Sequence, residues 1–176
     1  AERATVAEVF LADWAVVYFE ADSCSDLTGT DQTICDYMKR LENHDTMDDD
    51  YYPLDYPYDV WLHERTNLMR FHYNNDGNIW YDQIYWIGSE DHCNWWGITC
   101  NEDHAVKSII MPNNQMRTAS EFPIELTQFA FLEELDLSQN RIQGLIPDEI
   151  CNMGLTILKG DSNNCPSGCC TSVVQK

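Results

Sequence analysis

Side chains capable of chemistry are numerous in this chain, but their spacing fits no common catalytic or metal-binding pattern. None of the five histidines lies in HExxH or a comparable metal-binding arrangement; they are His44, His63, His72, His92 and His104. Neither GxSxG nor a glycine-rich phosphate loop occurs. Among 30 acidic side chains no spacing singles out an acid–base pair. We therefore expect no enzymatic activity, no cofactor and no metal.

The eight cysteines indicate a disulfide framework instead of thiol chemistry. Their number is even and they cluster at short spacings, which favours an oxidising compartment and full pairing. Cys24 and Cys35 flank a segment rich in Ser, Gly and Thr, so their bridge is the simplest local one. We expect a secreted protein, or one in an organelle lumen.

Charge and hydropathy exclude several partners. The chain has 30 acidic and 10 basic side chains and a net charge of −20, which argues against nucleic acid and anionic membranes as partners. No apolar run reaches the roughly 18 residues that a membrane-spanning helix needs. The sequence begins at Ala1 without an initiator Met, so we interpret it as a mature form whose targeting peptide was removed or left out.

The elements that must position any site centre on Leu132 to Pro147, which follow the pattern LxxLxLxxNxxxGxIP. This pattern is the leucine-rich repeat consensus. Leu135 and Leu137 alternate as in a strand and point into a core, whereas Asn140 and Gly144 suit turns. Weaker copies of the frame precede and follow it: Val106, Ile109, Met111 and Asn114, then Leu155, Leu158, Gly160 and Asn163.

Three copies of the frame predict an α/β fold, a short right-handed leucine-rich repeat solenoid of about three repeats. Parallel strands should contain Ile109–Met111, Leu135–Leu137 and Ile157–Lys159. A helix is expected over residues 4–20 and another from Asp59 to about Tyr73, ended by Asn74 to Gly77. The tryptophans that follow should cover the open end of the solenoid; they are Trp80, Trp86, Trp95 and Trp96.

The helix, the tryptophan-rich segment, CNWWGITC and the repeat consensus together resemble the plant-type leucine-rich repeat proteins, which include receptor-kinase ectodomains and polygalacturonase inhibitors. The resemblance covers about residues 59–170. It implies that Cys93 and Cys100 are bridged within an N-terminal cap, and that the cysteine-rich tail is a C-terminal cap. The expected segments are an extension over 1–58, a cap over 59–104, repeats over 105–164 and a tail over 165–176.

The tail contains Cys165, Cys169 and Cys170, which together with Cys151 should form two bridges. A bridge between the adjacent Cys169 and Cys170 would strain the peptide between them. We favour Cys151 with Cys169 and Cys165 with Cys170, although the spacing leaves the connectivity open.

Two surfaces are candidates for binding. The residues between the inward-pointing leucines form a repeat face: Ser108, Ile110, Glu134, Asp136, Ser138, Lys159 and Asp161. Aromatic anchors, which usually carry binding energy, gather upstream as an N-terminal interface: Trp14, Tyr18, Tyr51, Tyr52, Tyr56, Tyr58 and Trp61.

These surfaces support two functional hypotheses. The first is a structural or accessory subunit of a larger extracellular or lumenal assembly, which contacts other subunits, or copies of itself, mainly through residues 1–61. The alternative is a secreted recognition protein that binds a separate protein or glycan through the repeat face. Residues 1–60 carry 15 acidic and 3 basic side chains, so a basic or neutral protein partner is expected.

Overall fold

The computed structural model describes residues 24–42, 58–88, 90–118 and 121–175. The chain divides into two compact units, residues 1–51 and 52–176, each of which is described by itself. In the first unit, η1 (Cys24–Asp26) precedes α2 (Gly29–Glu42), and the expected disulfide joins Cys24 to Cys35. The helix predicted over residues 4–20 lies outside the described residues.

The second unit begins with α3 (Tyr58–Asn74), close to the predicted 59–73. The chain leaves the helix at Asp76, whose φ of 55° is left-handed, so the turn residue is neither of the asparagines nor Gly77. Short helical turns follow at η2 (Gly77–Ile79) and η3 (His92–Asn94). From here on, the N-terminal cap means residues 58–97, which is the part of the expected cap segment 59–104 that precedes the sheet.

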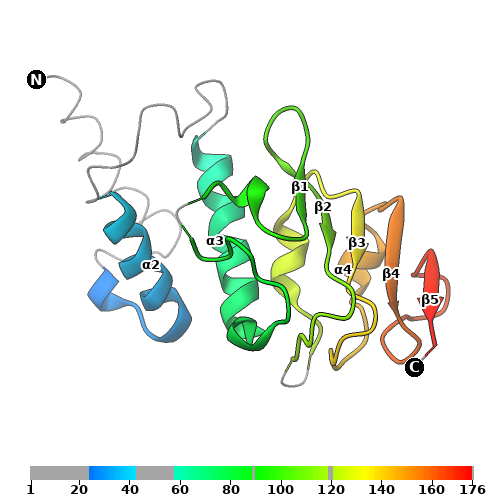
Figure 1. Ribbon diagram of the computed structural model, residues 1–176. Helices are drawn as coiled ribbons and strands as arrows, with labels where there is room; N and C mark the ends of the chain where they lie inside the picture. The colour runs from blue at the N-terminus through cyan, green and yellow to red at the C-terminus, as the bar shows by residue number, and fades with distance from the viewer. Residues whose placement is uncertain (1–23, 43–57, 89, 119–120, 176) are drawn as a thin grey trace, which may run out of the picture. The chain divides into compact units, whose positions relative to one another are not determined.

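Five strands form one sheet in the order β1-β2-β3-β4-β5 (Figure 1). β1 (Ile98–Cys100) pairs antiparallel with β2 (Val106–Ile110). β3 (Glu134–Asp136), β4 (Ile157–Asp161) and β5 (Ser172–Val174) continue the sheet in parallel. The three predicted strands therefore lie side by side as expected. β5 is an additional parallel strand in the segment expected to be only a cap.

The core lies on the inward side of the sheet. Ile109, Leu135 and Leu158 are in register on neighbouring strands and all are buried, as the repeat frame predicts. The opposite wall comes from η4 (Ile124–Gln128) and α4 (Asp148–Cys151), which contribute Leu126 and Ile150. In Figure 1, α4 lies behind the strands. No helix among the described residues is both long enough and apolar enough to span a bilayer.

Buried asparagines join successive turns. Asn140 Nδ2 donates to Met111 O and Leu137 O, whereas its Oδ1 accepts from the amides of Asn114 and Met116. The prediction that Asn163 completes this series is wrong: Asn163 is exposed. Its neighbour Asn164 is buried and donates to Ile142 O and Gly144 O, because β4 and its turn contain one more residue than the frame allows.

Disulfides close the C-terminal end in the favoured connectivity, Cys151–Cys169 and Cys165–Cys170. Gly160 occupies the frame position that Leu137 occupies in the preceding repeat. A Cβ added at Gly160 would lie 2.8 Å from Cys165 Sγ. The bridge fills the space that a leucine side chain would take, so glycine is required there.

Candidate protein-interaction surface

The cap is built around Arg65, a fully buried cation on α3. Its Nη1 donates to Glu90 O at 2.8 Å and its Nη2 to Gly88 O at 2.6 Å. The guanidinium carbon lies 5.1 Å from the ring centroid of Trp61 and 4.8 Å from that of Trp95. These contacts compensate for the loss of hydration and attach the segment around residue 88 to the helix.

Trp61 was expected at an interface, but its indole lies in the interior with 3% of its surface exposed. Its Nε1 donates to Asp91 Oδ2 at 3.0 Å, and its ring faces Arg65 and His92. The indole is therefore part of the cap, and we leave it out of the proposed contact surface. Of the other predicted anchors, Trp14, Tyr18, Tyr51, Tyr52, Tyr56 and the side chain of Tyr58 lie outside the described residues.

His72 also belongs to the interior of the cap. Its ring stacks on Trp86 at 5.8 Å between centroids and meets the edge of Trp80 at 5.0 Å. Burial lowers the pKa of His72 below its usual value of 6.5, although hydrogen bonds with Gln83 and the backbone of Gly77 oppose this effect. The neutral ring is therefore favoured in the folded protein.

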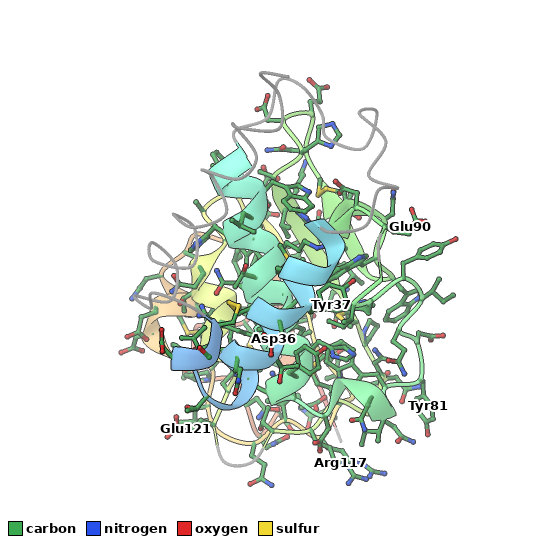
Figure 2. All side chains as sticks on the ribbon, turned by 90° about the vertical axis from the view of Figure 1, so that its left-hand side faces the viewer. Asp36, Tyr37, Tyr81, Glu90, Arg117 and Glu121 are labelled. Atoms are coloured by element: carbon green, nitrogen blue, oxygen red, sulfur yellow. A yellow bond between two sulfur atoms is a disulfide. The ribbon has the colours of Figure 1, made fainter. Side chains whose placement is uncertain are left out.

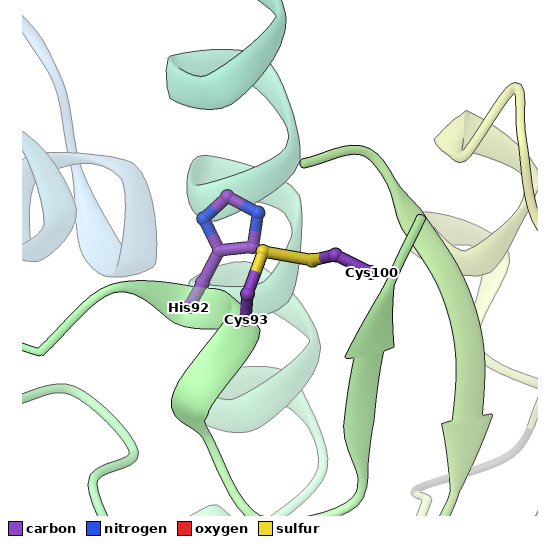
Figure 3. A group of neighbouring side chains, drawn as sticks. All are labelled: His92, Cys93 and Cys100. Carbon is purple, nitrogen blue, oxygen red and sulfur yellow. A yellow bond between two sulfur atoms is a disulfide. The ribbon is translucent and has the colours of Figure 1, made fainter. Parts of the chain in front are cut away.

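Figure 3 shows His92 beside Cys93 and Cys100, whose possible ligand atoms all lie within 4.8 Å of one another. The two sulfur atoms are bonded to each other, as expected from the resemblance, so neither is available as a thiolate ligand. His92 is fully buried, with Nε2 3.6 Å from Glu64 Oε2. Glu64 Oε2 in turn accepts from the amide of Val106 at 2.9 Å. This arrangement attaches the cap to the first repeat strand.

The sheet brings the predicted repeat face together in rows. Ser108 is in register with Glu134, and Ile110 with Asp136 and Lys159. Lys159 Nζ lies 3.4 Å from Asp136 Oδ2. Sequence alignment of the frames was enough to predict this juxtaposition, because register in a parallel sheet follows the repeat.

Much of this face is less accessible than expected. Ser108, Asp136, Ser138 and Asp161 are buried, whereas Ile110, Glu134 and Lys159 are partly exposed. Asp136 Oδ1 accepts from Ser138 Oγ at 2.6 Å, and Asp161 Oδ1 accepts from the amide of Gln139. These carboxylates hold turns in place, so the accessible part of the repeat face is small.

A second exposed surface was missed by sequence reasoning. It lies on residues 79–88, which we call the cap loop. Tyr81 is 63% exposed, Ile84 58% and Tyr85 55%. The buried tryptophans in the same segment conceal this surface, because the apolar side chains of WYDQIYWIG can all be assigned to a core. The sequence does not separate the two kinds of residue: Trp80 and Trp86 are buried, whereas the residues between them are exposed.

Two comparisons with known proteins bear on these features. Residues 131–153 match the family described as Leucine Rich Repeat. The chain is also similar to the inactive LRR receptor-like serine/threonine-protein kinase BIR2 of Arabidopsis thaliana, with 37% identity over 60 residues. That alignment covers 34% of this chain and 10% of the kinase, so the chain spans a small part of the relative's length. The segment 131–153 is therefore a leucine-rich repeat, and the chain is a protein that contains at least one such repeat.

Proposed function

We propose that the protein is a non-enzymatic interaction module that acts as an accessory subunit of a larger extracellular or lumenal assembly. Leucine-rich repeats generally mediate contacts between proteins, which supports the module. Four disulfides fit an oxidising compartment. In this proposal the chain forms a short right-handed solenoid of about three repeats with the plant-type cap.

The observation that carries the subunit role is the contrast between the two surfaces. The repeat face has few accessible side chains, and Asp136 is 6% exposed. Four large apolar side chains are exposed within seven positions of the cap loop, whereas the exposed Ile124, Phe131 and Leu145 of the repeats are spread along the chain and are not repeat-face residues. A protein that recognises ligands through its sheet needs the opposite distribution, because aromatic and arginine anchors usually carry the binding energy.

The test is the mass of the native protein. Gentle extraction from its source, followed by size-exclusion chromatography with light scattering, should give a mass well above the 20.4 kDa of the chain. The same stoichiometric partners should be present in each preparation. Recovery only as a monomer of that mass would contradict the subunit role.

A recognition role for the repeat face is the second candidate, favoured by Ile110, Glu134 and Lys159, which are partly exposed on the three neighbouring strands β2, β3 and β4. Under this alternative, Glu134→Lys should weaken ligand binding. The same change should leave the native mass unaffected if the accessory-subunit proposal is correct. The exposed Glu133 supplies a matched control, Glu133→Lys.

A further inference from the structure

The cap loop concentrates exposed apolar surface. Ile79, Tyr81, Ile84 and Tyr85 are four of the nine large hydrophobic side chains that are exposed among the described residues, and they fall within seven positions. Scattered exposed apolar residues need no explanation, but a concentration of them marks an interaction site. Sugar sites typically stack the sugar ring on aromatic side chains. A surface that combines tyrosine with isoleucine is more typical of a contact with another protein.

The loop is held at both ends and in the middle. Asn114 donates from Nδ2 to Asp82 O at 2.9 Å and accepts from the amide of Asp82 at 2.7 Å. Arg65 holds Gly88 at the other end. Between them, Trp86 Nε1 donates to Trp96 O at 2.8 Å. A fixed loop loses little conformational entropy when it binds, which favours affinity.

Two residues of the loop adopt left-handed backbone conformations. Tyr85 has φ of 67° and Ile87 has φ of 60°, a conformation that is rare for large and β-branched side chains. Hydrogen bonds close the turn, from Gly88 N to Tyr85 O and from Trp86 N to Gln83 O. The backbone therefore turns Trp86 into the core while Ile84 and Tyr85 remain exposed.

The loop lies beside the repeat face. Trp96 N donates to Ile84 O, and Gly97 O accepts from the amide of Ile110. Backbone hydrogen bonds thus connect the loop, through residues 96 and 97, to the row that contains Asp136 and Lys159. In Figure 2 the labelled Tyr81 and Glu90, at opposite ends of this region, lie on the same side of the view.

Charge indicates the kind of partner. Residues 76–104 contain six acidic side chains and no Lys or Arg. Asp82 is exposed beside Tyr81, and Glu90 is partly exposed. A partner patch that combines apolar and basic side chains would be attracted to this surface, whereas an acidic patch would be repelled.

We propose that the cap loop docks onto an apolar patch, bordered by Lys or Arg side chains, on a partner protein. This inference rests on the proposed function and identifies the surface through which the subunit is held. The side chains that make the contact are Ile84 and Tyr85, with Tyr81 beside them.

The first experiment measures binding of defined peptides to the full chain by isothermal calorimetry. The probe is the amphipathic helical peptide LKKLLKLLKKLLKL, and its counterpart LEELLELLEELLEL has the same apolar face with opposite charge. The double variant Ile84→Ser/Tyr85→Ser should bind the lysine peptide at least about tenfold more weakly than the wild type. The control Leu145→Ser removes an equally exposed side chain, 62% exposed, outside the cap and should change nothing.

Because neither variant changes the net charge, unspecific attraction to the acidic chain is the same in both. Equal affinity of the loop variant and the wild type, no detectable binding of the lysine peptide, or equal binding of the glutamate peptide would each overturn the proposal. If the wild type dimerises in sedimentation and the loop variant does not, the occupant is a second copy. Loss of binding to a neutral oligosaccharide such as cellohexaose in the loop variant would indicate a glycan site. Loop-dependent dimerisation or loop-dependent binding of the oligosaccharide would each overturn the proposal that the partner is a protein patch bordered by basic side chains.

The decisive experiment places the same variants in the source organism and compares native masses. The proposal expects the wild type and Leu145→Ser in the assembly and the loop variant outside it, with unchanged thermal melting. An assembly that retains the loop variant overturns the docking surface alone. A wild-type protein found only as a monomer overturns the accessory-subunit function itself, so the two failures are distinguishable.

Discussion

The N-terminal cap and the repeats are held together by different interactions. In the repeats, β2, β3 and β4 each add a leucine or isoleucine to a continuous core, and an asparagine joins one turn to the next. In the cap, a buried arginine and several aromatic rings hold irregular backbone through hydrogen bonds to carbonyl groups. In the repeats, the stabilising contacts are therefore distributed along the sheet, whereas in the cap they depend on a few side chains. Single substitutions of those cap side chains should have the largest effects on stability.

Arg65→Met provides the strongest test of this difference. Two carbonyl groups lose a charged donor, each hydrogen bond being worth about 1.5–3 kcal/mol, so the free energy of unfolding should fall by about 3–6 kcal/mol. Urea denaturation under non-reducing conditions measures it. Arg117→Met, at an exposed position, is the control and should be close to neutral. A loss below about 1 kcal/mol at Arg65 would show that the cap does not depend on the cation.

Leu135→Ala tests the core of the repeats. Leu135 is fully buried, so its truncation should cost roughly 2–5 kcal/mol, depending on how far the neighbouring strands relax. The exposed Leu145→Ala should have little effect on the melting temperature. If both variants melt alike, the leucine frame does not define the core.

Asn164→Ala and Asn163→Ala test which of the two adjacent asparagines stabilises the C-terminal turn. Removal of the Asn164 amide leaves Ile142 O and Gly144 O without this donor, which should cost about 1–3 kcal/mol. Asn163 is exposed, so its substitution should be nearly silent in the same denaturation experiment. The reverse order would restore Asn163 as the residue that continues the series.

His72→Phe should give the smallest effect, visible only as a dependence on pH. Because burial lowers the pKa of His72 in the folded protein, the contribution of its neutral ring is fully present above the unfolded value of 6.5 and is lost as pH falls toward the folded value. Melting curves from about pH 8 to about pH 5 should therefore show a steeper decline for the wild type than for the variant. If the melting temperatures of the wild type and the variant changed with pH in parallel, His72 would not be the group whose lowered pKa makes stability depend on pH.

The sequence was sufficient to predict the features that follow a pattern. The long helix was expected at 59–73 and runs from Tyr58 to Asn74, and the rows of the repeat face followed from aligned frames. The absence of a bridge between the adjacent Cys169 and Cys170 was expected from strain, and the structure agrees; the spacing did not decide between the two remaining connectivities. Each of these predictions rests on local spacing.

The remaining features depend on contacts between distant segments. A helical arginine normally indicates a solvated face, and nothing near Arg65 in the sequence reveals acceptors 23 and 25 residues away. Trp61 was expected at an interface for the same reason, since its partner Asp91 lies 30 residues downstream. The cap loop was missed because exposed tyrosines and buried tryptophans have similar hydropathy, and only the backbone conformation separates them.

The hydrogen bond from the amide of Val106 to the buried carboxylate of Glu64 has a consequence for the order of folding. It joins residues 42 positions apart, so closing that loop costs considerable entropy before any repeat strand is paired. Once α3 has docked, β2 has a fixed start and each later strand adds to an existing edge. We therefore expect the joining of α3 and β2 to be a slow step in folding, because it pairs segments that are distant in the sequence.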